Sequence, residues 1–299
     1  MSLFDTYIIV DWSASNVPKR GKDSIWACRQ GDAPINLATR SEAKSYLEAL
    51  LSDGIGKGER ILVGFDFPFG YPAGFAKRLR LAGEPWRSTW KFISDRITDG
   101  PKNGNNRFEI GAQLNERVSG GRFPFWGCPP KTPEEVLKFL GPRRNHPDSE
   151  PLRERRLIDQ WMVGAQPCWK LAYTGSVGSQ VLTGIPVVRA LRDDKRWEHC
   201  ARVWPFETGL TLPAEARIVF AEVWPSWWKW KETREEGEIA DRAQVRHVAG
   251  VFAQRDREGQ LDAWFTPPVP SECINDVVSE EAWTLGVVAP RLRKARGTA

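Results

Sequence analysis

Two short apolar segments that both end beside an aspartate constrain the fold of this chain more than any other feature. Residues 6–11 read TYIIVD and residues 60–67 read RILVGFDF. An unbroken apolar run of this length is typical of a strand that is buried on both faces of a sheet. Two further strand candidates, residues 24–28 and 35–39, lie between them and are joined by a glycine-containing turn. The first three strands therefore read as an antiparallel meander.

A helix separates this meander from the second apolar strand. Ser41 is suited to cap the helix, and apolar side chains recur on one face through about Leu51. A strand reached through a helical crossover lies parallel to the first strand or to its neighbour. This element order opens a ribonuclease H-like fold. The sequence therefore predicts an α/β protein with a mixed sheet, in which three antiparallel strands are followed by parallel strands, with helices on both faces.

A long insertion precedes the end of the fold. Residues 73–200 have loops rich in Pro and Gly, and they contain helix candidates at 75–82, 86–97, 133–140 and 152–163. Strand candidates follow at 201–207 and 217–225, and a helix at about 238–254. We expect residues 1–72 and 201–299 to form the ribonuclease H-like core. The insertion is then a large helical and loop segment that packs on the core as a lid or substrate platform.

Four acids recur in similar settings. Asp11 and Asp66 fall at the carboxyl ends of neighbouring strands, where open α/β sheets bind ligands. Glu222 follows another apolar run, and Asp241 continues the buried stripe of the last helix. Carboxylates this close raise one another's pKa, and a pair of Mg²⁺ or Mn²⁺ ions would neutralise them. We therefore predict all four as metal ligands and catalytic groups of a metal-dependent nuclease or phosphodiesterase.

Simpler interpretations of these acids remain open. A strand-terminal aspartate can cap a turn. Glu222 could pair with an arginine of the insertion, and Asp241 could be an ordinary acid favoured by the helix dipole. Glu207, in WPFETG, is a rival for the third ligand.

Several motifs occur in the order of a known family. They are VDWSAS, GFDFPFGYP, AEVWPS, DRAQV and EEAWTLGV. Together they resemble the DUF429 family of predicted nucleases with a ribonuclease H-like fold, over most of the chain. The resemblance implies Asp11, Asp66, Glu222 and Asp241 as the site. The family usually has Asp-Ala where this chain has Asp241 and Arg242, so Arg242 has to point outward.

The basic residues suit a nucleic acid or another phosphate-containing substrate. Residues 77–122 hold ten Lys or Arg against five acids, which equals the whole formal net charge of +5. A merely solvated surface explains this equally well. The candidate substrate-binding residues are Ser13, Ser15, Lys102, Arg107, Ser176, Ser179 and Gln180. The last three lie in the glycine-rich segment 173–186, which lacks a P-loop lysine and also reads as a structural loop.

Other classes of protein fit less well. The five cysteines form no C-x-x-C pair and the three histidines are scattered, which disfavours zinc and a disulfide framework. The N-terminus has no signal-peptide pattern and no segment reads as a membrane span, so we expect a cytoplasmic protein without a membrane partner. Two alternatives share the fold: a non-catalytic protein that binds nucleic acid or nucleotide, and an actin-like or sugar-kinase-like enzyme that uses ATP.

Overall fold

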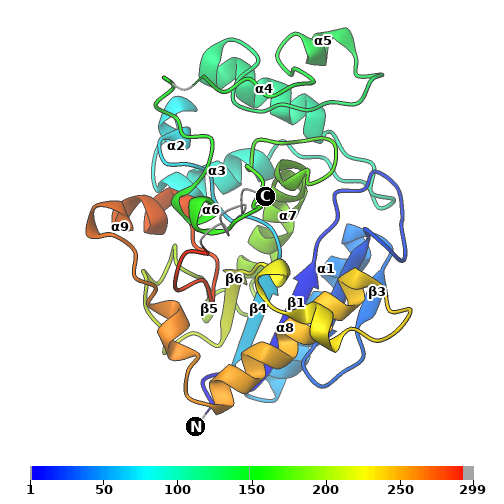
Figure 1. Ribbon diagram of the computed structural model, residues 1–299, viewed down its shortest axis with the longest axis vertical. Coiled ribbons are helices and arrows are strands. Elements are labelled where there is room, and N and C mark those ends of the chain that lie inside the picture. The colour runs from blue at the N-terminus through cyan, green and yellow to red at the C-terminus, as the bar shows by residue number, and fades with distance from the viewer. Residues whose placement is uncertain (1, 148, 292–299) are drawn as a thin grey trace, which may run out of the picture.

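A six-stranded mixed sheet forms the centre of the computed structural model, which describes residues 2–147 and 149–291 (Figure 1). The strands are β1 (Thr6–Asp11), β2 (Ile25–Arg29), β3 (Ile35–Leu37), β4 (Ile61–Phe65), β5 (Ala201–Val203) and β6 (Ile218–Glu222). Their order in the sheet is β3-β2-β1-β4-β6-β5. The first three pair antiparallel, whereas β1, β4, β6 and β5 are parallel neighbours. The predicted ribonuclease H-like mixed sheet is confirmed.

Both faces of the sheet are covered, which explains the unbroken apolar runs. Along β1, Ile8 and Val10 belong to one hydrophobic cluster and Tyr7 and Ile9 to the other, as the alternation of a strand requires. Helices α1 (Arg40–Gly56) and α7 (Val177–Arg192) contribute to the first cluster. Helix α8 (Ala240–Arg257) lies across β1 and β2 and contributes to the second (Figure 1).

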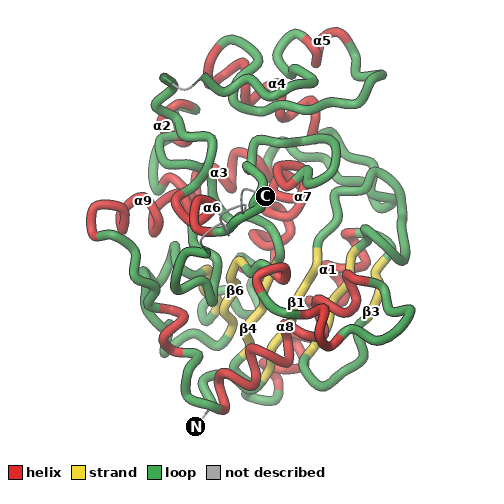
Figure 2. The backbone as a smooth tube through the Cα atoms, in the orientation of Figure 1, coloured by secondary structure: helices red, strands yellow, loops and turns green. Residues whose placement is uncertain are grey.

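The remaining helices are short and most belong to the insertion. They are α2 (Phe75–Arg78), α3 (Pro85–Ser94), α4 (Arg107–Ser119), α5 (Glu134–Leu137), α6 (Leu157–Trp161) and, near the end of the chain, α9 (Ile274–Asp276). Short 3₁₀ segments cover Pro225–Trp227, Trp230–Thr233, Asp262–Phe265 and Ser271–Cys273, and a π-helical turn covers Val277–Glu281. Figure 2 shows that loops make up much of the region around α2, α4 and α5. One hydrophobic cluster joins Phe65 of the sheet to Trp90 and Leu114 of the insertion.

Two local expectations are corrected, and one helix was missed. Helix α1 is capped by Thr39, whose hydroxyl accepts the backbone N–H of Glu42, rather than by Ser41. Helix α4 was not predicted. The loop prediction for residues 173–186 is wrong from Val177 onward, because α7 begins there and packs on the sheet. Among the described residues, no helix is long and apolar enough to cross a membrane.

The glycines of α7 serve close packing. A Cβ at Gly178 would lie 2.3 Å from the carbonyl oxygen of Cys168, and a Cβ at Gly184 would lie 2.3 Å from the ring of Phe67. Both contacts are too close for any side chain, so glycine is required at each position. The glycines that suggested a loop are therefore explained by the close packing of this helix.

Candidate acidic site

Asp11 and Asp66 meet at the carboxyl ends of two parallel strands. Asp11 is the last residue of β1, and Asp66 directly follows β4, its neighbour. The backbone holds them together: Asp66 N donates to Val10 O at 3.1 Å, and Trp12 N donates to Asp66 Oδ1 at 2.7 Å. The two carboxyl groups are also hydrogen-bonded to one another, and both are partly exposed. The predicted pair is therefore present.

Their electrostatics are those of a crowded acidic site. Burial, and then the charge of Asp66 and of Asp241, raise the pKa of Asp11 well above its usual range. Burial raises the pKa of Asp66 to about 7, although its hydrogen bonds with Asp11 and with the backbone N–H of Trp12 oppose the shift. Both shifts favour a proton on the pair when no cation is bound. A cation would take the place of that proton.

Asp241 is the third acid that the structure brings to this place. It lies in the first turn of α8, where burial raises its pKa, and its Oδ2 accepts the backbone N–H of Asp23 at 2.6 Å. Arg242 points away, because its Nη1 lies 2.6 Å from Glu238 Oε1 in an ion pair. Asp241 therefore faces the cavity while Arg242 faces away from it, as the resemblance requires.

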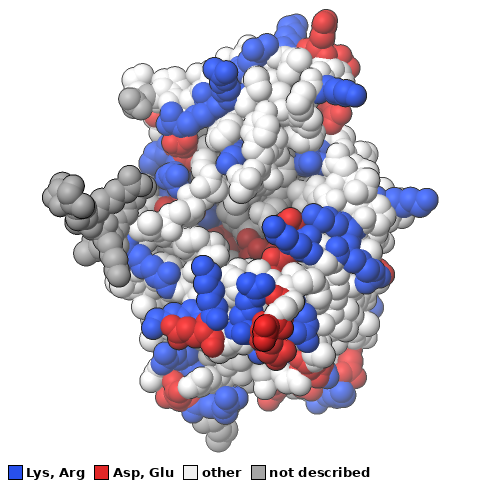
Figure 3. Space-filling view, turned by 45° about the vertical axis from the view of Figure 1, so that its right-hand side comes forward, with Lys and Arg blue, Asp and Glu red and all other residues white. Residues whose placement is uncertain are grey.

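Asp11 and Asp241 line a cavity of about 680 Å³, whereas Asp66 lines a separate, smaller cavity. The wall of the larger cavity includes five predicted substrate-binding residues, Ser13, Ser15, Arg107, Ser176 and Gln180, and one that was not predicted, Lys19. Two predicted residues do not line it. Lys102 is exposed on the neighbouring loop, and Ser179 is buried with its hydroxyl donated to Leu171 O at 2.5 Å. Figure 3 shows acidic side chains in a central hollow with Lys and Arg side chains beside it.

Arg107 contributes a positive charge to this wall. Its Nε donates to Ser179 Oγ at 2.8 Å, and its Nη1 donates to the side-chain oxygens of Asn105 and Asn16. All of these acceptors are neutral, and among the described residues Arg107 has no carboxylate within 4.0 Å. Burial and the nearby Arg40 lower its pKa to about 10, so it stays charged at neutral pH. An arginine held this way is suited to an anionic ligand.

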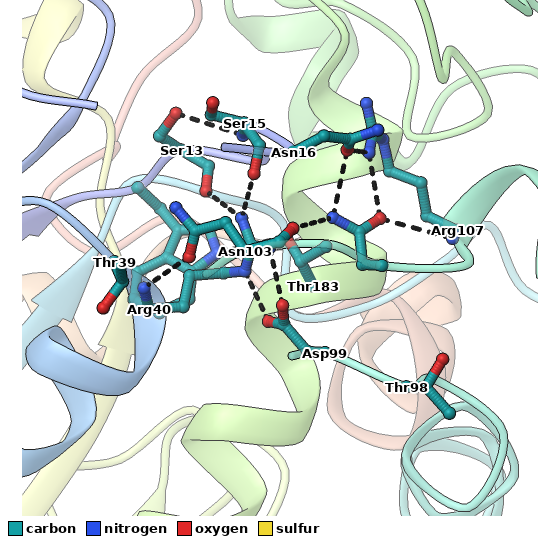
Figure 4. Close-up of polar contacts among 12 residues, drawn as sticks. Ser13, Ser15, Asn16, Thr39, Arg40, Thr98, Asp99, Asn103, Arg107 and Thr183 are labelled. Atoms are coloured by element: carbon teal, nitrogen blue, oxygen red, sulfur yellow. Dashed lines mark hydrogen bonds and ion pairs between the residues drawn. The ribbon is translucent and has the colours of Figure 1, made fainter. Parts of the chain in front are cut away.

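Arg40 holds the turn that follows Asp11, and sequence reasoning missed it. The side chain is only 2% exposed, and its Nη1 donates to Ser13 O at 3.0 Å and Ser15 O at 2.8 Å (Figure 4). The same guanidinium pairs with Asp99 and donates to Asn103 O at 2.7 Å. A positive side chain in the first turn of a helix is unfavourable, because it opposes the helix dipole. This unfavourable placement of Arg40 was the feature of the sequence that could have marked it as functional.

Glu222 ends β6 beside Asp66 but has a different environment. Arg156 donates to both of its oxygens, at 2.7 and 2.8 Å, while Thr284 Oγ1 and Phe69 N donate at 2.7 and 3.0 Å. Each carboxylate oxygen thus accepts two hydrogen bonds, which leaves no position for a cation. Arg156 is shared with Asp159 at 2.8 Å. The open alternative, pairing with an arginine of the insertion, is the arrangement found.

Glu207, the rival ligand, is also engaged elsewhere. Arg192 donates to its two oxygens at 3.0 and 2.6 Å, and Val203 N donates at 2.9 Å. Glu222 and Asp66 do border a common small cavity of about 50 Å³. The ion pair with Arg156 nonetheless occupies the Glu222 carboxylate.

The donor set suits a hard cation. Among residues 2–147 and 149–291, no group of three or more His, Cys, Asp or Glu is arranged to hold a metal ion. The Asp11–Asp66 pair offers carboxylate oxygens alone, and Mg²⁺ commonly binds through one or two carboxylates with water and substrate phosphate completing its shell. The residues therefore fit one such ion at the pair better than two ions held by four carboxylates.

No family model, curated protein or solved structure matches this chain. The resemblance to the DUF429 family therefore stays a prediction, and the assignment of a function depends on the geometry of the acidic cavity.

Proposed function

We propose that this chain is a divalent-cation-dependent phosphodiester hydrolase, most specifically a nuclease, whose cation binds at Asp11 and Asp66. One observation carries the proposal: two hydrogen-bonded carboxyl groups with raised pKa values lie at adjacent parallel strand ends, beside a polar cavity. Such a pair is costly for folding unless something positive is bound there. Ligand sites of open α/β sheets occur at this edge.

The carboxylates hold and orient the cation in this proposal. When bound, Mg²⁺ or Mn²⁺ supplies a Lewis acid for a phosphoryl oxygen and lowers the pKa of the attacking water. Asp11 and Asp66 provide the ligands, and their backbone hydrogen bonds through Val10 and Trp12 fix the distance between the strands. Asp241 adds negative charge from α8 and strengthens the attraction for a cation.

Arg107 binds the phosphate in this account. The Nη2 group of Arg107 has no hydrogen-bond partner among the described residues, while its Nε and Nη1 are fixed by Ser179 and Asn105. A guanidinium held by two of its nitrogens can present the third to a phosphate oxygen without further ordering. Lys19, Ser13 and Ser15 line the same cavity and supply further donors.

Cleavage assays test the proposal. Labelled single-stranded, duplex, hybrid and branched nucleic acids are incubated with the protein and Mn²⁺, and the products are separated by length. Asp11→Asn and Asp66→Asn should each lower the cleavage rate by at least about a thousandfold, which is the effect of losing about 4 kcal/mol of transition-state stabilisation. Asp262→Asn, at an exposed position outside the cavity, is the matched control and should cleave normally. Cleavage that survives both active-site variants contradicts the proposal.

A non-catalytic protein that binds nucleic acid is the second candidate. It is favoured by the lack of a three-acid metal group in the described part of the chain. Nucleic-acid affinity without any binding of Mg²⁺ or Mn²⁺ would support it over the first. The ATP-using alternative is disfavoured, because the described residues form one sheet rather than the two of a duplicated enzyme. An increase in the thermal stability of the protein on addition of ATP would support the ATP-using alternative.

A further inference from the structure

The insertion contains a second cavity, of about 510 Å³, with the opposite charge to the first. Four basic side chains line it, together with the apolar Val118 and Leu152: they are Lys77, Arg78, Arg80 and Arg117. Among the described residues, no acid lines this cavity. It is formed where α2, α4 and the segment around residue 151 meet, and its four basic residues belong to the stretch 77–122, which accounts for the net positive charge.

Most of this positive charge is uncompensated. Arg78 pairs with Glu150, but no carboxylate lies within 4.0 Å of Lys77, Arg80 or Arg117 among the described residues. Elsewhere on the surface, basic side chains commonly pair with a nearby acid, as Lys91 does with Asp95 and Lys57 with Asp53. Three unpaired cations around one concavity repel one another and attract an anion.

Arg117 is held in place by the chain, and Arg80 has an unusual backbone conformation. Arg117 Nε donates to Leu79 O at 2.6 Å, and its guanidinium lies 5.0 Å from the centre of the Phe92 ring. Arg80 has a φ of 54°, in the left-handed region that residues other than glycine rarely adopt. Backbone strain of this kind persists where the surroundings impose it, and it is concentrated at ligand sites. Because the Arg117 side chain is ordered before binding, it loses less entropy when it binds.

We infer that this cavity binds the phosphate backbone of a nucleic-acid strand, at a site separate from the acidic cavity. Arginine guanidinium groups match phosphate in charge and in the geometry of their paired donors. The site also has a short covalent connection to the acids. Ala73, which lines it, follows Asp66 by seven residues, so their Cα atoms are at most about 25 Å apart. The further idea that one nucleic-acid strand occupies both cavities rests on the proposed function. Binding of the strand at the basic cavity does not depend on it.

The test measures binding without cleavage. A fluorescent single-stranded oligonucleotide is titrated with the full chain in EDTA at several salt concentrations. The variant combines Lys77→Gln with Arg80→Gly, because glycine relieves the left-handed backbone and leaves folding intact. The control combines Lys131→Gln with Arg143→Gln, two exposed residues of the insertion that lie outside the cavity and remove the same charge.

The double variant should bind about tenfold more weakly at low salt. The slope of the logarithm of the binding constant against the logarithm of the salt concentration should be shallower by about 1.4, or about 0.7 for each lost phosphate contact on a single strand. The control should change the affinity less than about twofold. Equal affinity and slope for variant and wild type overturn the inference, as does an equal loss in the control. Binding of pyrophosphate but not of the strand overturns the assignment to nucleic acid. Because no metal is present, these results are independent of whether Asp11 and Asp66 catalyse.

Discussion

Asp66, directly after β4, and Glu222, the last residue of β6, lie at neighbouring strand ends, yet their environments are opposite. Asp66 is hydrogen-bonded to another acid, and burial raises its pKa to about 7. Glu222 has a buried arginine and four hydrogen bonds. The difference comes from the insertion, which places Arg156 against one strand end and leaves the other open to a cavity. A strand-terminal acid therefore becomes a candidate ligand only where no cation of the chain already neutralises it.

The largest effect is expected for Arg156, which has a structural role as the partner of Glu222. Arg156→Met leaves the Glu222 and Asp159 carboxylates buried without their partner, and should lower the free energy of unfolding by about 3–5 kcal/mol. Urea denaturation followed by tryptophan fluorescence measures this. Adding Glu222→Gln to Arg156→Met should recover part of the loss. An unchanged unfolding midpoint for Arg156→Met would show that this network does not stabilise the fold.

The affinity of the open pair for Mn²⁺ should depend steeply on pH. The Asp66 carboxyl has a pKa of about 7, and burial and the charge of Asp66 also raise the pKa of Asp11, so protons compete with the cation as the pH falls. Competition at Asp66 alone should raise the dissociation constant about tenfold in total from pH 8 to pH 6, or about 1.4 kcal/mol. Calorimetric titration at three pH values measures it. An affinity that is flat over this range rules out binding at the Asp11–Asp66 pair.

Asp66→Asn should make the cation-free protein more stable. The folded pKa of Asp66 is raised above the unfolded value of about 3.9. Its contribution to stability is therefore complete below about pH 4 and is lost as the pH rises through 7. Allowing for its partial exposure, the variant should gain about 1–2 kcal/mol at pH 8 and nothing at pH 4. Thermal unfolding with EDTA checks this, and a loss of stability at pH 8 would be the wrong sign.

The smallest effect concerns Asp241. Asp241→Asn keeps the acceptor for the backbone N–H of Asp23 but removes a charge that acts on Asp11 through space. The affinity for Mn²⁺ should fall by about three- to fivefold, or about 0.7–1 kcal/mol. Asp262→Asn is again the control. A loss as large as that of Asp11→Asn would instead make Asp241 a direct ligand.

The sequence predicted the sheet and one of its two acidic environments. Apolar periodicity identified β1 and β4, and the crossover rule made them parallel, so Asp11 and Asp66 had to meet. It could not reveal Arg156, because the partner of Glu222 is 66 residues away and its placement depends on how the insertion packs. Tertiary packing also explains the wrong prediction at α7. The glycines of this helix allow close packing, but in the sequence they resemble the glycines of a loop.

Diffraction from crystals grown with Mn²⁺ at pH 8 tests the central claim most directly. The account predicts an anomalous peak within about 2.1 Å of an oxygen of Asp11 and of Asp66, with no peak at Glu222. Carboxyl groups that remain bonded to one another at millimolar Mn²⁺, with no peak between them, would contradict it.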